Sequence, residues 1–474
     1  MKKVLSTVAA LGLVAGMVTS AAALELKIKG DYTVDGFYID DSKGAAALPG
    51  TEAGGGGVDL TSPAAKSDAW LQHMFNIEAE MVVNDKISMM SRVRLIDWGT
   101  VWGSQDDTQV NNGRNMSIER LWMVYKSDIG LWDIGRRPGG AWGLSFVDTA
   151  GNNDRIMWRS GKLLGDTFSA YAFFQKNTEA EAYLANVDDR DTDYYEVAGA
   201  AKGGWGSATL AYGITLNNAS DRPDTGAIST TTYAITGVDG SSVPTTTKAT
   251  TTVTPAFFGF ETTQHRIKGV GQFKIASNMG LDTEFDYIWG EKDYNLATKT
   301  DSDISTFAFI ADFWATMDAL TAHAMYFHTS GDDNAEADND ITNYGGTGAD
   351  FEPLYILTGA FGRILNQDQG ISDAQTAGVH AVVLSADYAA SQDLSLRAAI
   401  GYAKADDQRL TNGVRWESDY GVEYNVGAAY KLQDNLIYAV HLGYLDTGDF
   451  FQQGNASTEL NNIFLASHHL TMSF

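Results

Sequence analysis

Residues 379–388 read VHAVVLSADY, and their side chains alternate between two sets. The set that becomes more apolar towards the end of the stretch is His380, Val382, Leu384, Ala386 and Tyr388. Because successive side chains of a β-strand point to opposite faces, the pattern predicts a strand on which this set meets lipid. A core strand of a soluble protein can show the same alternation, so the inference depends on its repetition.

Residues 436–445 (LIYAVHLGYL) repeat this arrangement. Their apolar face consists of Leu436, Tyr438, Val440, Leu442 and Tyr444. Tyr438 and Tyr444 lie near the two ends of that face, where membrane strands place aromatic residues at the lipid–water boundary. The stretch is therefore typical of a membrane-spanning strand.

Eighteen candidate strands recur along the chain, and an even number places both ends of a barrel on the same side of the membrane. The least regular are 130–137 and 155–162, and a barrel without that pair would have sixteen strands. Either number leaves an aqueous lumen. The candidates are 24–37, 70–82, 86–98, 115–126, 130–137, 155–162, 167–176, 194–202, 206–216, 265–275, 280–289, 304–315, 320–328, 379–388, 394–403, 422–432, 436–445 and 464–474.

Short turns and long loops alternate between these candidates. The longest loops are 38–69, 217–263 and 329–377. The asymmetry predicts an all-β fold, a transmembrane antiparallel up-and-down β-barrel with short periplasmic turns and long extracellular loops. A soluble β-sandwich does not require its loops to be longer at one end than at the other. The short turns are 83–86, 127–130, 203–206, 277–280, 316–318, 391–393 and 433–435.

The composition agrees with many half-apolar strands. Gly is abundant at 49 residues, Pro is scarce at 7, aromatic residues make up 11%, and the mean hydropathy is −0.19. The first residues carry Lys2 and Lys3, an apolar run over 4–18 and small residues up to Ala23. This is the pattern of a cleaved export signal, so we expect a signal peptide over 1–23 and a single barrel domain over 24–474.

The formal net charge of −27 argues against nucleic acid as a partner. Such acidity can bias a pore towards cations. It can equally reflect acidic loops that keep an exported protein soluble and bind divalent ions at the cell surface, and both interpretations stay open.

The sequence lacks the usual marks of an enzyme. It contains no cysteine, which excludes disulfides, thiol sites and Cys-based metal centres. It also lacks a nucleophile elbow, a His-Glu-x-x-His motif and a phosphate loop. We therefore expect neither catalysis nor a cofactor.

Eight of the fifteen arginines fall between residues 92 and 159. Arg92 and Arg94 share one face of their strand, as do Arg155 and Arg159. Arginine on a lipid face near the midplane costs roughly 2–4 kcal/mol, so these faces are expected to point into water. The eight are Arg92, Arg94, Arg114, Arg120, Arg136, Arg137, Arg155 and Arg159.

Carboxylates opposite an arginine wall would set up a transverse field that orients polar solutes. The expected acidic partners are Asp97, Asp148 and Asp154. The glycine-rich loop 138–154 is the candidate constriction, with Trp142 and Phe146 packing against the inner wall. The alternative is a plain extracellular loop above ordinary interior salt bridges. The expected pore-lining residues are Arg92, Arg94, Asp97, Arg136, Arg137, Asp148, Asp154, Arg155 and Arg159.

The acidic stretch 332–340 offers oxygen ligands suited to calcium, namely Asp332, Asp333, Asp338 and Asp340. It lacks the ordered glycine and terminal glutamate of a calcium-binding hand loop. A solvated acidic loop is the favoured interpretation.

The chain ends in Leu470, Thr471, Met472, Ser473 and Phe474, an aromatic residue with apolar residues two and four positions before it. This terminus resembles that of Gram-negative outer-membrane porins of the general diffusion type. The resemblance covers the mature chain as an architecture. It implies recognition of the last strand by the barrel-assembly machinery, a homotrimer in outer-membrane lipid, and a loop folded into each lumen.

The function expected from this resemblance is a water-filled channel for passive diffusion of small hydrophilic solutes and ions across the bacterial outer membrane. A solute-specific outer-membrane channel is one alternative. A surface adhesin or structural barrel is another, to which the Thr-rich loop 217–263 would contribute.

Overall fold

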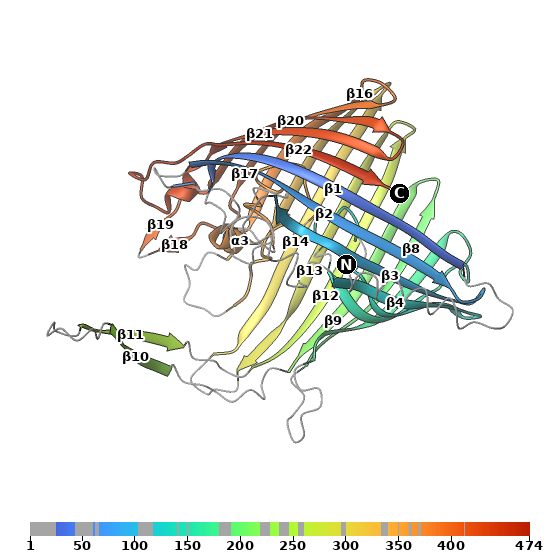
Figure 1. Cartoon of the computed structure of the whole chain (residues 1–474), viewed down its shortest axis with the longest axis horizontal. Helices are drawn as coiled ribbons and strands as arrows, with labels where there is room; N and C mark the ends of the chain where they lie inside the picture. The colour runs from blue at the N-terminus through green and yellow to red at the C-terminus, as the bar shows by residue number, and fades with distance from the viewer. Residues whose placement is uncertain are drawn as a thin grey trace, which may run out of the picture.

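The computed structural model (Figure 1) shows how the predicted strands are joined. No helix among the described residues is long and apolar enough to cross a membrane. The described residues are 25–42, 60–61, 66–102, 117–139, 142–148, 151–179, 191–218, 228–236, 246–254, 260–294, 300–332, 340–348, 350–359, 363–367, 371–411 and 413–474.

Eighteen antiparallel strands form one closed β-barrel. Each strand pairs with its neighbours in the chain, and the pairing of β1 with β22 closes the ring, from Asp31 opposite Ser473 to Ile39 opposite Leu465. The strands are β1 (Glu25–Ser42), β2 (Lys66–Val82), β3 (Ile87–Val101), β4 (Ser117–Ser127), β5 (Gly130–Pro138), β6 (Asn152–Arg159), β7 (Phe168–Thr178), β8 (Thr192–Gly203), β9 (Gly206–Asn217), β12 (Phe260–Ala276), β13 (Met279–Tyr294), β14 (Ser302–Met317), β15 (Leu320–Thr329), β16 (Val379–Ala389), β17 (Leu394–Lys404), β20 (Asp419–Gln433), β21 (Leu436–Thr447) and β22 (Ile463–Ser473).

The structure confirms the eighteen-strand prediction over the sixteen-strand alternative. The two least regular candidates become β5 and β6, which pair from Leu131 opposite Arg159 to Pro138 opposite Asn152. The eighteen strands therefore include the two least regular candidates.

Several short elements are not part of the barrel wall. The Thr-rich stretch 217–263, expected to be a loop, contains a hairpin of β10 (Ile228–Thr236) and β11 (Thr246–Thr254), because its β-branched residues favour extended backbone. The others are β18 (Leu410–Thr411), β19 (Val414–Arg415), the helix α3 (Ser372–Ala377) and a 3₁₀ turn, η4 (Asp449–Gln452).

The strand faces follow the predicted alternation. In β16, Val382 and Leu384 keep about half of their surface exposed, whereas Val383 between them is buried. In β21, Tyr438 and Tyr444 are both exposed on the predicted apolar face. The wall therefore presents apolar side chains outwards and its other set of side chains inwards.

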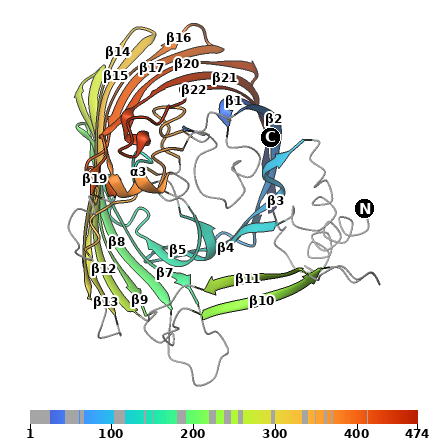
Figure 2. The ribbon, with the colours of Figure 1, turned by 90° about the vertical axis from the view of Figure 1, so that its left-hand side faces the viewer.

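The described residues 340–348, 350–359, 363–367 and 371–378 of the long connection between β15 and β16 fold into the barrel, and we call them the plug segment. Glu423 on the inner face of β20 accepts the backbone N–H groups of Ile356 at 2.8 Å and Leu357 at 2.7 Å. Tyr355 stacks on His441 of β21 with ring centroids 4.6 Å apart. Seen from the long-loop end, α3 lies inside the ring of strands (Figure 2).

For the described residues of 340–377, this placement corrects the expectation of an extracellular loop over 329–377. The segment carries large apolar side chains that are removed from water only when it packs inside the barrel. The fully buried side chains of this group are Leu354, Ile356, Leu357, Ile364 and Leu365.

Replacing Glu423 with alanine is expected to loosen the plug segment. The carboxylate is fully buried, and its removal leaves two amide donors without an acceptor at roughly 1–3 kcal/mol each. Hydrogen–deuterium exchange of peptides covering 354–358 should accelerate. Glu291→Ala, at an exposed position of β13, is the control and should leave this exchange unchanged. Equal protection in the Glu423 variant and the wild type would contradict the anchoring role.

Candidate functional site in the barrel lumen

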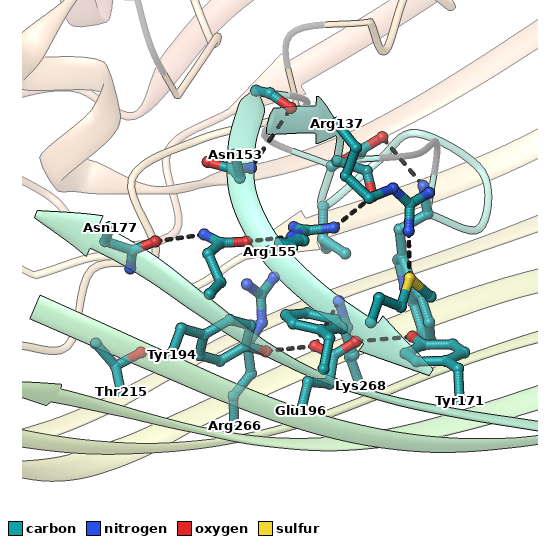
Figure 3. Close-up of a pocket in the computed structure, with 18 of the residues that line it drawn as sticks. Arg137, Asn153, Arg155, Tyr171, Asn177, Tyr194, Glu196, Thr215, Arg266 and Lys268 are labelled. Atoms are coloured by element: carbon teal, nitrogen blue, oxygen red, sulfur yellow. Dashed lines mark hydrogen bonds and ion pairs between the residues drawn. The ribbon is translucent and has the colours of Figure 1, made fainter. Parts of the chain in front are cut away.

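A pocket of about 530 Å³ lies inside the barrel beside the inner faces of the strands from β5 to β9, with β12 and β13 (Figure 3). Residues 142–148, which we call the inner loop, close one side of it through Trp142, Val147 and Asp148. The pocket is therefore bounded by the barrel wall and by a segment that leaves the wall between β5 and β6.

Four cationic side chains line this pocket, and three of them pair with carboxylates. Since the partners are buried, these charges are compensated inside the wall. The pairs are Arg137 with Asp133 at 3.3 Å, Lys268 with Glu196 at 3.0 Å, and Arg266 with Asp286.

Arg155 is the fourth cation, and the groups that it contacts directly are neutral. Its Nη1 donates to the carbonyl of Gly139 at 2.8 Å, its Nε donates to Gln175, and its guanidinium lies 4.3 Å from the ring centre of Phe173. In the described part of the chain no carboxylate lies within ion-pair distance of Arg155. Its charge is therefore available to an anionic group that enters the pocket.

Neutral hydrogen-bonding side chains surround Arg155. Figure 3 shows Tyr171 and Tyr194 on either side of Glu196, and both hydroxyls donate to that carboxylate, Tyr171 at 2.7 Å. Asn177 accepts from the amide of Gln175. The further neutral polar residues that line the pocket are Asn153, Thr215 and Gln264. Such a lining can hydrogen-bond a hydrated solute at several points.

Glu284 on β13 holds the inner loop inside the barrel. Its carboxylate accepts the N–H groups of Leu144 at 2.6 Å and Val147 at 3.3 Å. Phe146 is fully buried, with its ring centre 5.7 Å from that of Phe327 and 5.1 Å from that of Phe351. The inner loop is thus attached to the wall by hydrogen bonds and to the plug segment by aromatic packing.

Asp148 and Trp142 complete the inner loop. Asp148 accepts the backbone N–H of Trp142 at 3.0 Å, and burial raises the pKa of its carboxyl group above the ordinary value. The ring of Trp142 lies 4.2 Å from Nζ of Lys268. The loop therefore meets the basic side of the pocket through a cation–π contact.

The structure brings three of the expected pore-lining residues together in this pocket, namely Arg137, Asp148 and Arg155. Arg159 lies on the same face of β6 as Arg155, but it pairs with Asp133 at 2.8 Å. Asp133 therefore forms ion pairs with two arginines, Arg137 and Arg159.

Arg92 and Arg94 lie on the inner side of another part of the wall. Both contact Glu119, at 3.2 Å and 2.8 Å respectively. The register of β3 and β4 shifts between Arg92 and Val93, so that Glu119 is an extra residue and turns inwards beside Arg120. This bulge has no signal in the sequence.

The expectation that Arg136 and Asp154 line the pore does not hold. Both are exposed, 3.5 Å apart, and they share the outer faces of β5 and β6 with Ile134 and Ile156. Adjacent strand residues face opposite sides, so Arg136 cannot follow Arg137 inwards. The side chains of Asp97 and Arg114 lie outside the described residues.

The calcium hypothesis gains no support from the described residues. Asp340 accepts the backbone N–H of Asp303 at 3.1 Å. Neither Asp332 nor Asp340 belongs to a group of three potential metal ligands within the described part of the chain. Asp333 and Asp338 lie outside it.

Sequence reasoning missed Glu196, Arg266, Lys268 and Glu284. Arg266 and Lys268 stand two positions apart in a predicted strand, which is the signal that marks Arg92 and Arg94. The partners of these charges could not be found in this way, because Glu196 and Lys268 come from strands far apart in the sequence.

The fold and the pocket together define a closed eighteen-stranded antiparallel β-barrel with a charged and polar interior. No family model and no curated protein matches the chain.

Solved structures do resemble it. Pseudomonas aeruginosa OpdQ is 10% identical, with a TM-score of 0.50 over 95% of this chain and 98% of that chain. P. aeruginosa OccK3 (OpdO) is 13% identical, with a TM-score of 0.49 over 94% and 96%. A loop-deletion mutant of OmpT, an outer membrane protein of Vibrio cholerae, is 11% identical, with a TM-score of 0.39 over 96% and 100%. At 10% identity the likeness to OpdQ shows the fold alone.

Replacing Gly143 with alanine is expected to push the inner loop away from Glu284. Gly143 has φ +56°, and an added Cβ would lie 2.5 Å from Oε2 of Glu284. Gly165 also has positive φ, +78°, but its added Cβ would meet nothing within 4 Å. Gly165→Ala therefore measures backbone strain alone, about 1–2 kcal/mol. Only Gly143→Ala should accelerate hydrogen exchange of residues 144–147, and equal exchange in the two variants would refute the steric argument.

Proposed function

We propose that this protein is a bacterial outer-membrane channel, a porin that carries small hydrophilic solutes and ions by passive diffusion. The observation that carries the proposal is a closed barrel with an apolar outer face around a polar, charged pocket. A closed barrel satisfies its strand hydrogen bonds internally, which a bilayer requires of any structure that spans it.

Two aromatic belts on the outer face support a membrane location. Tyr424 lies opposite Tyr444 nearer the long-loop end of β20 and β21, and Tyr430 lies opposite Tyr438 nearer the short-turn end. All four are exposed. Paired belts of this kind mark the two lipid–water boundaries of membrane barrels. The long-loop end would then face the cell exterior, and residues 1–23 would act as the export signal.

The inner loop and the plug segment support a narrow path in place of a wide pore. Each is fastened to the wall by a buried glutamate, Glu284 or Glu423. The polar pocket remains beside them. A solute would pass the side chains around Arg155 while hydrogen-bonded to their hydroxyl and amide groups.

A solute-specific channel is a second candidate, favoured by the surroundings of Arg155. A guanidinium with neutral neighbours would attract an anionic group on a solute, and the adjacent polar side chains would orient the rest. The two candidates share one path and differ in whether permeation saturates with solute concentration.

The remaining partners follow from the resemblance to porins. We propose that the barrel-assembly machinery recognises the terminal strand, in which Phe474 is half exposed and exchanges backbone hydrogen bonds with Gly30. We also propose that the barrels associate as homotrimers, which native mass spectrometry of the detergent-solubilised protein would test.

Replacing Arg155 with alanine is expected to shift ion selectivity towards cations. Loss of one charge in a narrow path should lower the anion-to-cation permeability ratio by roughly fivefold, which corresponds to about 1 kcal/mol. The measurement is the reversal potential of single channels in a planar bilayer under a salt gradient. Arg136→Ala removes an arginine from the outer face and should leave the ratio unchanged.

Several results would count against these proposals. Ohmic steps with the same selectivity in both variants would keep the channel but remove Arg155 from the path. Absence of conductance from folded protein would favour an adhesin or a structural barrel. Saturation of conductance by one class of anionic solute would favour the solute-specific channel.

Replacing Leu384 with arginine tests the membrane face. Leu384 points outwards, and a charge there should cost about 2–4 kcal/mol if the position lies near the bilayer midplane. Ser385→Arg, one residue on and facing inwards, should cost less because its charge reaches the lumen. Urea unfolding in lipid vesicles gives both free energies. Equal costs would contradict the assignment of the two faces.

A further inference from the structure

Two histidines and one aspartate gather where the plug segment joins the wall. His328 lies at the end of β15, His380 at the start of β16, and Asp406 just after β17. One ligand atom from each residue lies within 4.8 Å of the others, and this is the sole such group among the described residues. All three side chains are partly exposed, so an ion can reach them.

The geometry is close to that of a metal centre. Oδ1 of Asp406 lies 2.7 Å from Nε2 of His380 and 3.8 Å from Nδ1 of His328. The two imidazole rings stack with centroids 4.4 Å apart. Ligand atoms around tetrahedral zinc are about 3.3 Å apart, given bonds of about 2.0–2.1 Å. The group therefore needs only small side-chain movements to surround an ion.

Each candidate ligand also has a partner that would orient it. Nδ1 of His328 lies 3.2 Å from the carbonyl of Val379, a contact that positions the ring. Oδ2 of Asp406 accepts the backbone N–H of Gly331 at 2.9 Å. Such outer partners are characteristic of metal ligands.

Tyr326 is the partner that would orient His380. Its hydroxyl lies 2.8 Å from Nδ1 of that ring. A hydroxyl can donate or accept a hydrogen bond, so its oxygen can accept one from Nδ1–H when an ion replaces the proton on Nε2. The imidazole can therefore switch tautomer and remain neutral.

We propose that His328, His380 and Asp406 bind a divalent transition-metal ion of the zinc class. Two imidazoles and one carboxylate suit Zn²⁺, whereas Ca²⁺ and Mg²⁺ prefer oxygen ligands alone. Water would fill the remaining coordination positions.

The position of Asp406 gives the ion a structural consequence. Besides its contact with Gly331, where the connection to the plug segment begins, Asp406 donates its backbone N–H to the carbonyl of Ala377, near the end of that segment, at 3.1 Å. An ion held by Asp406 and both histidines would join β15, β16 and the segment after β17. We call this place, where the plug segment joins the wall, the neck of the plug segment. Metal binding would therefore clamp the base of the plug segment.

Isothermal titration of ZnCl₂ into tag-free, chelator-treated full-length protein in detergent tests the site. We expect one ion per chain, with affinity at least tenfold weaker in His328→Ala, His380→Ala and Asp406→Asn. His265→Ala is the matched control, because His265 also contacts a tyrosine hydroxyl, that of Tyr212 at 2.7 Å, but belongs to no such group among the described residues. Circular dichroism confirms that each variant folds.

Two outcomes overturn the assignment: no zinc bound by the wild type, or equal binding by the wild type and the three site variants. The clamp is tested by hydrogen exchange of peptides covering 371–379, which zinc should slow in the wild type and in His265→Ala but not in His380→Ala. Unchanged exchange in zinc-bound wild type would overturn the clamp. Neither measurement uses a bilayer, so both are independent of the proposed channel function.

Discussion

The pairing of β1 with β22 is the constraint on which the rest of this structure depends. It removes the two free edges that an eighteen-stranded sheet would otherwise expose, and it divides every strand into one outward and one inward face. Outward positions such as Leu384 then carry apolar side chains. Inward positions carry charges, many of which pair with one another, as Lys268 does with Glu196.

Two segments narrow the lumen, and a buried glutamate holds each of them by accepting two backbone N–H groups. Glu284 accepts two backbone N–H groups from the inner loop, and Glu423 accepts two from the plug segment. A loop that leaves the wall carries amide groups without strand partners, and a buried carboxylate with two oxygens can satisfy a pair of them. The apolar cluster around Phe146, Phe327 and Phe351 then joins the two segments to each other and to β15. The polar pocket is the space left beside this packed region.

The two polar sites differ in what surrounds their charges. In the pocket, Lys268, Arg266 and Arg137 are compensated by carboxylates, whereas Arg155 contacts a carbonyl, an amide and an aromatic ring. At the neck of the plug segment, His328 and His380 face one carboxylate oxygen on the outer side of the wall. The first arrangement suits passage of a hydrated solute. The second suits a bound ion that holds neighbouring segments together.

Alternation with a period of two is readable in the sequence, and it determined the barrel fold, a count of eighteen or sixteen strands, and the outward faces of stretches such as 379–388. The sequence also indicates Arg137, Arg155 and the loop that contains Asp148 as lumen residues, but Arg136 and Asp154 lie on the outer face because each is adjacent to an inward-facing residue. Only the tertiary structure decided which loops enter the lumen and which charges meet. Those outcomes depend on strand register and on contacts between residues more than a hundred positions apart, such as Leu144 with Glu284, for which local sequence patterns carry no signal.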